Sequence, residues 1–204
     1  MNTPLTLMPA RMGPFDAGMA RRQANRQGLV QVHMRAGTLA HVTQVSTWLG
    51  GWDALAARLE PLMPVPSATG RSAWSGSDWI VRTGPEELLV IASDGTGLLR
   101  QLREALSDDI GHSLDLSHAR CLLRLQGEGA VPCLQKLFAL DFREPAFAVG
   151  EARLSGSHHL PAMLHRVALD TFDLYLNTSH ARDQVESLFD AALEWGVELS
   201  LATP

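Results

Sequence analysis

The chain has 204 residues, of which 46% are hydrophobic and 19% are charged. Soluble domains typically carry a charged share of about 25%, so this composition excludes a disordered chain or a charge-rich coiled coil and predicts one bilobed domain or two small ones. The 17 Lys and Arg residues against 22 Asp and Glu residues give a net charge of −5, which supplies no basic field for a phosphate backbone, so nucleic acid is not expected as a partner.

Residues 1–27 predict an arm rather than a folded element. Pro4, Pro9 and Pro14 interrupt any regular period, and Arg21 begins a basic cluster near the end of the segment. The segment holds no apolar run of signal-peptide length, and no stretch of the chain approaches the roughly 20 apolar residues that span a bilayer. We therefore expect a cytoplasmic protein without membrane contact, whose arm either frays or orders against a partner subunit.

Residues 28–110 predict a first α+β half. In chain order it holds a β-branched strand run at 39–47, a helical face at 52–59 closed by Pro61, an alternating strand segment at 82–93 and a helical stripe at 98–106.

Residues 111–204 predict a second half with the same order of elements. They hold an alternating strand at 119–125 with Cys121, Leu123 and Leu125 on one face, a helix at 130–138 with Pro132 in its first turn, a hairpin formed by 159–166 and 171–176, and a helix at 185–193. Ser179 or Thr178 is the expected N-cap of the last helix, and Gly196 is its expected stop.

An internal duplication explains this common order. Laid without gaps over residues 166–177, residues 82–93 match arginine to arginine at Arg82 and Arg166 and keep the same alternate positions apolar. The fold class that follows is α+β, with two pseudo-repeated β-α-β-β-α halves of ferredoxin-like type whose antiparallel or mixed sheets are covered by helices.

The segment Asp115-Leu-Ser117-His118 holds the three residue types of a hydrolase triad. Triad members converge from distant parts of a chain, and a G-x-S-x-G elbow is absent, so we do not assign a triad here. We expect the Asp115 and Ser117 oxygens to cap backbone N–H groups of a turn that precedes the strand.

Other candidate sites are weaker than their structural alternatives. Gly95-Thr-Gly97 lacks the third glycine of a dinucleotide fingerprint and predicts a capped turn. The histidines His158, His159 and His165 form the densest metal-ligand group, but H-E-x-x-H and C-x-x-C are both absent, so a solvated turn at His158–His159 is favoured over a zinc site.

The remaining reactive side chains also predict structural roles. Cys121 and Cys133 are the only cysteines, too few for a disulfide scaffold, and Cys133 has no neighbouring His or cationic cluster that would make it a catalytic thiolate. The acidic pair Asp108-Asp109 indicates a loop. Trp74 and Trp79 lie inside the Ser- and Gly-rich loop W-S-G-S-D-W, where they form either an exposed aromatic pair that anchors a partner or an intramolecular packing pair.

Several short blocks together resemble a known family. The run at 115–142, which begins D-L-S-H-A-R-C-L-L-R-L, resembles the opening module of folate-dependent aminomethyltransferases, the T-protein fold. With G-P-E-E-L-L-V-I at 84–91, M-L-H-R at 163–166, F-D-L-Y-L at 172–176 and E-W-G at 194–196, the chain resembles the gamma subunits of heterotetrameric sarcosine oxidases.

The resemblance implies a four-subunit flavoenzyme complex in sarcosine catabolism and one-carbon metabolism. Such a complex oxidatively demethylates sarcosine to glycine, using oxygen, and passes the one-carbon unit to tetrahydrofolate. The resemblance implies FAD, FMN, NAD and tetrahydrofolate on the alpha and beta subunits and zinc on the delta subunit. This chain would be a scaffold in that complex, with no catalytic, cofactor-binding or metal-binding residues of its own.

One departure from the transferase pattern supports the scaffold interpretation. Aminomethyltransferases carry paired acidic residues in a hairpin after the first helix, whereas the corresponding stretch here, residues 155–166, holds no carboxylate. Three alternatives remain open. They are a freestanding folate-binding one-carbon transferase-like protein, a subunit of a related N-methyl amino acid oxidase or demethylase, and an interaction module of an unrelated complex.

Overall fold

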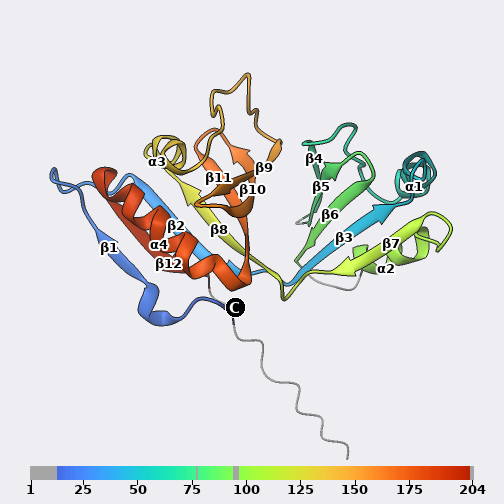
Figure 1. The fold of residues 1–204 in the computed structure, drawn as a ribbon, viewed down its shortest axis with the longest axis horizontal. Coiled ribbons are helices and arrows are strands. Elements are labelled where there is room, and N and C mark those ends of the chain that lie inside the picture. The colour runs from blue at the N-terminus through green and yellow to red at the C-terminus, as the bar shows by residue number, and fades with distance from the viewer. Residues whose placement is uncertain (1–12, 77, 94–96, 203–204) are drawn as a thin grey trace, which may run out of the picture.

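The computed structural model describes residues 13–76, 78–93 and 97–202, which fold into two β-sheets flanked by helices (Figure 1). The larger sheet is mixed, because β12 and β2 pair in parallel and its other neighbours are antiparallel. Its strands follow the order β1 (Arg21–Gln23), β12 (Val197–Leu201), β2 (Val32–Thr38), β8 (Arg120–Gln126), β11 (Thr171–Asn177), β10 (Leu160–Ala168) and β9 (Ala152–Ser157).

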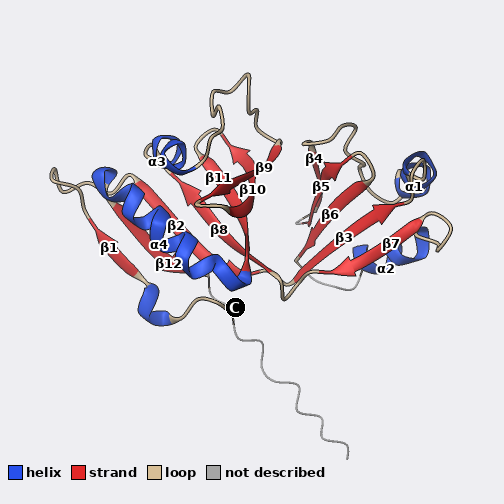
Figure 2. Cartoon of the chain, in the orientation of Figure 1, coloured by secondary structure: helices blue, strands red, loops and turns tan. Residues whose placement is uncertain are grey.

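The smaller sheet has five antiparallel strands. Their order is β4 (Ser72–Ser75), β5 (Asp78–Gly84), β6 (Glu87–Ala92), β3 (His41–Thr47) and β7 (Gly111–Asp115). The helices are α1 (Trp52–Leu59) and α2 (Leu98–Ala105) beside this sheet, and α3 (Ala130–Leu137) and α4 (Ala181–Ala192) beside the larger one (Figure 2). The predicted α+β class, with antiparallel or mixed sheets covered by helices, is confirmed.

Three hydrophobic clusters define four layers, in the order helices, sheet, sheet, helices. One cluster joins α3 and α4 to the larger sheet and a second joins α1 and α2 to the smaller sheet. The third lies between the sheets and contains the buried residues Leu39, Val42, Val81, Leu89, Ile91, Ala152, Met163 and Tyr175. Because each sheet is buried on both faces over this area, its central strands are continuously apolar, as in L-L-V-I-A of β6.

Two of the helix ends follow local sequence signals. Helix α3 carries Pro132 in its first turn, as predicted. The 3-10 turn that follows α4 (Leu193–Trp195) ends at Gly196 with φ +73°, where a Cβ atom would lie 2.0 Å from the Leu29 carbonyl oxygen, so only glycine fits. The predicted N-cap of α4 is wrong. Thr178 and Ser179 lie in a 3-10 turn (Thr178–His180), and His180 occupies the cap position without a side-chain bond.

The chain passes from the larger sheet to the smaller one between β2 and β3, and it returns between β7 and β8. β2 pairs with β8 and β12, although it precedes β3 of the smaller sheet, and β7 pairs with β3 although it precedes β8. Each of the predicted halves, residues 28–110 and 111–204, therefore contributes one strand to the sheet of the other. The division into these halves stays a prediction.

The described part of the N-terminal arm, residues 13–27, orders on its own chain. β1 pairs with β12 along the outer edge of the larger sheet, and Met19 is buried. Arg21 pairs with Glu186 of α4, so the basic end of the arm is anchored there. Residues 1–12 lie outside the described part. Among the described residues, no helix is long and apolar enough to cross a membrane.

Candidate functional site

The two sheets meet where the segment before β4 lies against the segment before β9. The Ser72 amide donates to the Gly150 carbonyl at 2.9 Å, and the Ala152 amide donates to the Gly70 carbonyl at 2.8 Å. Arg71 and Glu151 form an isolated antiparallel bridge between these bonds. The edges of the two sheets are therefore joined by backbone hydrogen bonds, and we call these residues, 70–72 and 150–152, the inter-sheet junction.

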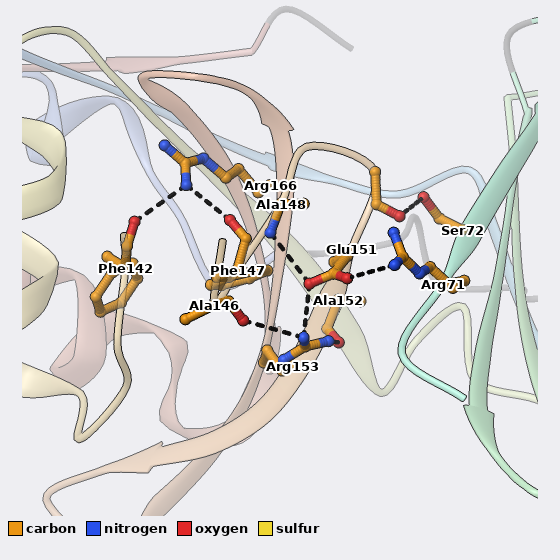
Figure 3. A network of polar contacts seen from close by, with 11 residues as sticks. Arg71, Ser72, Phe142, Ala146, Phe147, Ala148, Glu151, Ala152, Arg153 and Arg166 are labelled. Atoms are coloured by element: carbon orange, nitrogen blue, oxygen red, sulfur yellow. Dashed lines mark hydrogen bonds and ion pairs between the residues drawn. The ribbon is translucent and has the colours of Figure 1, made fainter. Parts of the chain in front are cut away.

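A buried carboxylate, that of Glu151, organises the junction (Figure 3). Its oxygens accept from Arg71 Nη2 at 3.1 Å, Arg153 Nη2 at 2.6 Å and the Ala148 amide at 3.1 Å. Arg71 comes from the smaller sheet and Arg153 from the larger one. The single carboxylate thus ties both sheets together with charge-assisted hydrogen bonds.

A serine, a histidine and an aspartate also meet at the junction, which the sequence did not predict. His165 Nε2 lies 2.8 Å from Ser72 Oγ, and Asp173 is the cross-strand neighbour of His165 on β11. His165 and Asp173 are both fully buried or nearly so. These residue types are those of a nucleophilic triad, so the geometry decides whether Ser72 is activated.

The hydrogen bonds show that Ser72 is not activated. Its hydroxyl donates to the Gly150 carbonyl at 2.8 Å, so His165 Nε2 donates to the hydroxyl rather than accepting its proton. Burial lowers the pKa of His165 to about 4, which makes it a poor base at neutral pH. Both Asp173 oxygens are taken by Arg124, at 2.6 and 2.7 Å, and His165 Nδ1 has no hydrogen-bond partner. The arrangement links the sheets and does not supply a nucleophile.

A cavity of about 340 Å³ lies beside the junction, between β5 and β9. Val81, Ala152, Leu154 and Met163 give it an apolar wall. A second cavity of about 100 Å³ shares Leu154 and Met163 with it. The space is large enough for an apolar side chain or a small ligand.

The two arginines that line the larger cavity are already bonded. Arg82 donates to the carbonyl oxygens of Ser67, Gly84 and Pro85, and Arg153 donates to the Ala146 carbonyl and to Glu151. Both guanidinium groups are therefore held in place by acceptors of the protein itself.

The segment Asp115–His118 forms the turn that its sequence predicts. Asp115 Oδ1 accepts from the Ser117 amide at 2.8 Å and from the Ser117 hydroxyl at 2.5 Å, and these bonds hold the pKa of Asp115 below its usual value. Ser117 Oγ also accepts from the Val42 amide at 3.0 Å. His118 is exposed. The turn fastens the crossing between β7 and β8 to β3.

The histidine cluster of the sequence is not brought together. His158 and His159 are exposed at the β9–β10 turn with φ of 50° and 66°, as predicted for a solvated turn, whereas His165 is buried at the junction. Among the described residues, no group of three or more His, Cys, Asp or Glu side chains is arranged to hold a metal ion. The predicted turn at Gly95-Thr-Gly97 falls mainly on residues 94–96, which lie outside the described part.

The other predicted residues have structural roles. Cys121 and Cys133 are buried and unpaired, and burial raises the pKa of each thiol to about 12. Asp108 and Asp109 lie in the loop after α2, and the hydroxyl of Ser107 holds the pKa of Asp109 below its usual value.

The two tryptophans lie on a β-hairpin instead of the predicted loop, because Trp74 on β4 pairs with Trp79 on β5. Their rings meet edge to face at 5.6 Å. Trp79 packs against the His165 ring at 4.5 Å, whereas Trp74 is 64% exposed. The pair therefore divides between the two predicted roles: Trp79 packs within the chain and Trp74 faces outward.

No family model matches the chain. Curated relatives do. The chain is 29% identical over 202 residues to the sarcosine oxidase subunit gamma of Corynebacterium sp. (strain P-1), which covers 97% of each chain. It is 31% identical over 147 residues to the sarcosine oxidase subunit gamma of an Arthrobacter species, which covers 71% of each.

Solved structures also resemble the chain. A chain of the heterotetrameric sarcosine oxidase from Corynebacterium sp. U-96, in complex with pyrrole 2-carboxylate, superposes with a TM-score of 0.73 and 28% identity, covering 85% of this chain and 88% of that one. The glycine cleavage system aminomethyltransferase T from Bartonella henselae superposes with a TM-score of 0.57 and 15% identity, covering 88% of this chain and 55% of that one. The second match shows that the fold is aminomethyltransferase-like.

Proposed function

Because the chain belongs to the family of sarcosine oxidase gamma subunits, we propose that it is the gamma subunit of a heterotetrameric sarcosine oxidase-type complex. The complex oxidatively demethylates sarcosine to glycine and transfers the one-carbon unit to tetrahydrofolate. This chain is a structural subunit of it, and its partners are the alpha, beta and delta subunits. The observation that carries the proposal is the alignment with a gamma subunit over 97% of both chains.

The inter-sheet junction supports a scaffold role. A scaffold must present its surfaces in a fixed relative position, and here backbone bonds, the Glu151 ion pairs and the Ser72–His165 bond hold the two sheets together. Within the described part of the chain, the Ser72, His165 and Asp173 arrangement is kept from acting as a catalytic triad by burial of His165 and by the Arg124–Asp173 pair. Rigidity rather than chemistry is what these residues supply.

The cofactors of the complex are proposed to lie on other subunits. FAD, FMN, NAD and tetrahydrofolate would be bound by the alpha and beta subunits and zinc by the delta subunit. The bonded state of Arg82 and Arg153 agrees with a folate site outside this chain. A cytoplasmic location is part of the proposal, because a reducing compartment suits two unpaired cysteines.

Co-expression tests the proposal. The alpha, beta and delta subunits are produced with and without this chain, with an affinity tag on the beta subunit, and sarcosine-dependent oxygen consumption is measured on the purified material. We expect this chain to co-purify in equal amount and the oxidase activity to be lost or unstable without it. A panel of N-methyl amino acids in the same assay distinguishes sarcosine from a related substrate. Equal assembly and equal activity without this chain would exclude the scaffold role.

A further inference from the structure

The loop between β3 and α1 exposes two large apolar side chains. Leu49 is 97% exposed and Trp48 is 51% exposed. We call these two residues the Trp48–Leu49 tip. Figure 1 shows that the loop leads into α1 at the outer end of the smaller sheet, away from the larger sheet. Adjacent exposed apolar side chains that form a patch with a polar rim are one form of an interaction site.

The tip is held in place rather than loose. Trp48 Nε1 donates to the Asp108 carbonyl at 2.8 Å, the Trp48 amide donates to the Ile110 carbonyl at 2.8 Å, and the Trp48 ring lies 5.3 Å from the His112 ring. The Gly51 amide donates back to the Trp48 carbonyl at 2.8 Å. These contacts fix the backbone on both sides of Leu49.

Glu86 closes the loop from the neighbouring strand turn. It accepts from the Gly50 amide at 3.1 Å and from the Thr47 hydroxyl at 2.5 Å, and these bonds lower the pKa of its carboxyl. Gly50 has φ +81°, which favours glycine, and a Cβ atom there would meet nothing within 4 Å. A loop that is ordered before binding loses little conformational entropy when a partner covers it.

The rim of the tip is acidic. Asp53 in the first turn of α1 is exposed, and Asp108 and Asp109 are exposed in the loop whose carbonyl holds Trp48. Of the cations near the tip, Arg58 already donates to the Ala105 carbonyl and to the Ser107 hydroxyl, and the Arg82 guanidinium lies over the Trp52 ring. An apolar centre with exposed carboxylates on the neighbouring segments is complementary to an apolar pocket with a basic rim.

We propose that the Trp48–Leu49 tip is an anchor that inserts into an apolar pocket rimmed by Arg or Lys side chains on another subunit of the complex. The inference rests on the proposed function, because it needs a partner protein. It deepens that function by naming the surface of this chain that docks and the chemistry of the surface that receives it.

The test compares two exposed leucines in the full chain, with each variant purified alone and the alpha, beta and delta subunits co-expressed and purified together. Leu49→Asp adds a charge at the tip, and Leu169→Asp adds the same charge at the β10–β11 turn, where Leu169 is 60% exposed. Binding of each purified variant to the remaining subunits is measured by biolayer interferometry. We expect Leu49→Asp to weaken binding at least about tenfold, as for a central hot-spot residue, and Leu169→Asp to leave it unchanged.

A third variant tests the basic rim. Asp53→Asn, Asp108→Asn and Asp109→Asn are combined, and the affinity is measured over a series of salt concentrations. We expect weaker binding and a flatter salt dependence than for the unmodified chain. If the unmodified chain fails to bind the other subunits, the proposed function itself is wrong. If it binds and Leu49→Asp binds equally well, the anchor is excluded, and an unchanged salt dependence of the triple variant excludes the basic rim.

Discussion

Arg82 and Arg166 make the same backbone contact in two different sheets. The Nη2 atom of each donates to the carbonyl oxygen three residues later, that of Pro85 at 2.7 Å and that of Leu169 at 2.6 Å. In each hairpin the strand register shifts directly after the arginine. The ungapped match of residues 82–93 to 166–177 aligns these two arginines. The contact supports the duplication, which stays an inference.

Loss of the Arg166 side chain is expected to destabilise the protein. Arg166 is 5% exposed and donates to the carbonyl oxygens of Phe142, Phe147 and Leu169. Arg166→Ala leaves all three acceptors without this donor, and we expect the free energy of unfolding to fall by about 3 kcal/mol or more in a urea titration. Arg182→Ala, which breaks an exposed ion pair with Asp16, is the control and should change it by about 0.5 kcal/mol or less. Equal effects of the two variants would contradict this account.

Neutralising Glu151 is expected to loosen the contact between the sheets. Glu151→Gln removes the charge that Arg71 and Arg153 share, and we expect a loss of about 2 kcal/mol in the free energy of unfolding. Hydrogen–deuterium exchange should rise at residues 70–72 and 150–152 more than in the rest of the described chain. Glu186→Gln, which breaks the exposed pair with Arg21, is the control. Unchanged exchange at the junction would contradict the role of Glu151.

Stability is expected to fall between pH 7 and pH 5 because of His165. Burial lowers the pKa of His165 to about 4, from 6.5 for an exposed imidazole, so the unfolded chain takes up a proton in this range before the folded chain does. Stability from this group is therefore complete above pH 6.5 and is lost as the pH falls toward 4. By linkage, we expect the loss from pH 7 to pH 5 to be about 2 kcal/mol.

Two variants assign that pH dependence. His165→Gln removes the titrating group, so its free energy of unfolding should depend less on pH over this range than that of the unmodified chain. His158→Gln removes an exposed histidine and should leave the pH dependence as it is. The same pH dependence in all three proteins would show that His165 titrates normally.

Both cysteines are expected to be unreactive in the folded protein. Burial raises the pKa of Cys121 and of Cys133 to about 12, so both stay protonated at pH 8, and the thiolate is the reactive form. We expect no labelling by a chromogenic disulfide reagent at pH 8 within minutes, and two equivalents after addition of guanidinium chloride. Rapid labelling of the folded chain would contradict the burial of one or both thiols.

The isolated chain is expected not to bind tetrahydrofolate. The cavity between the sheets is lined by two arginines whose guanidinium groups already bond to the protein, and residues 155–166 supply no carboxylate for the folate ring. Isothermal titration should show no saturable heat. Saturable binding in the micromolar range would favour the freestanding folate-binding alternative.

Local patterns predicted the elements whose signals are local. The alternation of Cys121, Leu123 and Leu125 identified β8, and the helical faces closed by Pro61 and opened near Pro132 identified α1 and α3. The prediction contains no strand at Val32–Thr38 or Val197–Leu201. These strands pair in parallel across the length of the chain, and a short alternating run does not reveal such a partner.

The inter-sheet junction was beyond sequence analysis for the same reason. Arg71 and Glu151 stand in loops far apart in the chain, where a single charged residue looks like ordinary surface. The Ser72–His165 contact joins a strand edge to a buried cross-strand pair, and no motif contains both residues. The Trp48–Leu49 tip, in contrast, has a local signal in the sequence, because two large apolar residues stand directly before Gly50-Gly51.

Native mass spectrometry of the affinity-purified complex tests the central claim most directly. The tag is placed on the beta subunit, and the alpha subunit, the delta subunit and this chain are co-expressed without tags. We expect a single major species whose mass equals one copy of each of the four chains. A species of the other subunits alone, with this chain absent from the purified material, would contradict the assignment of this protein as a subunit of the complex.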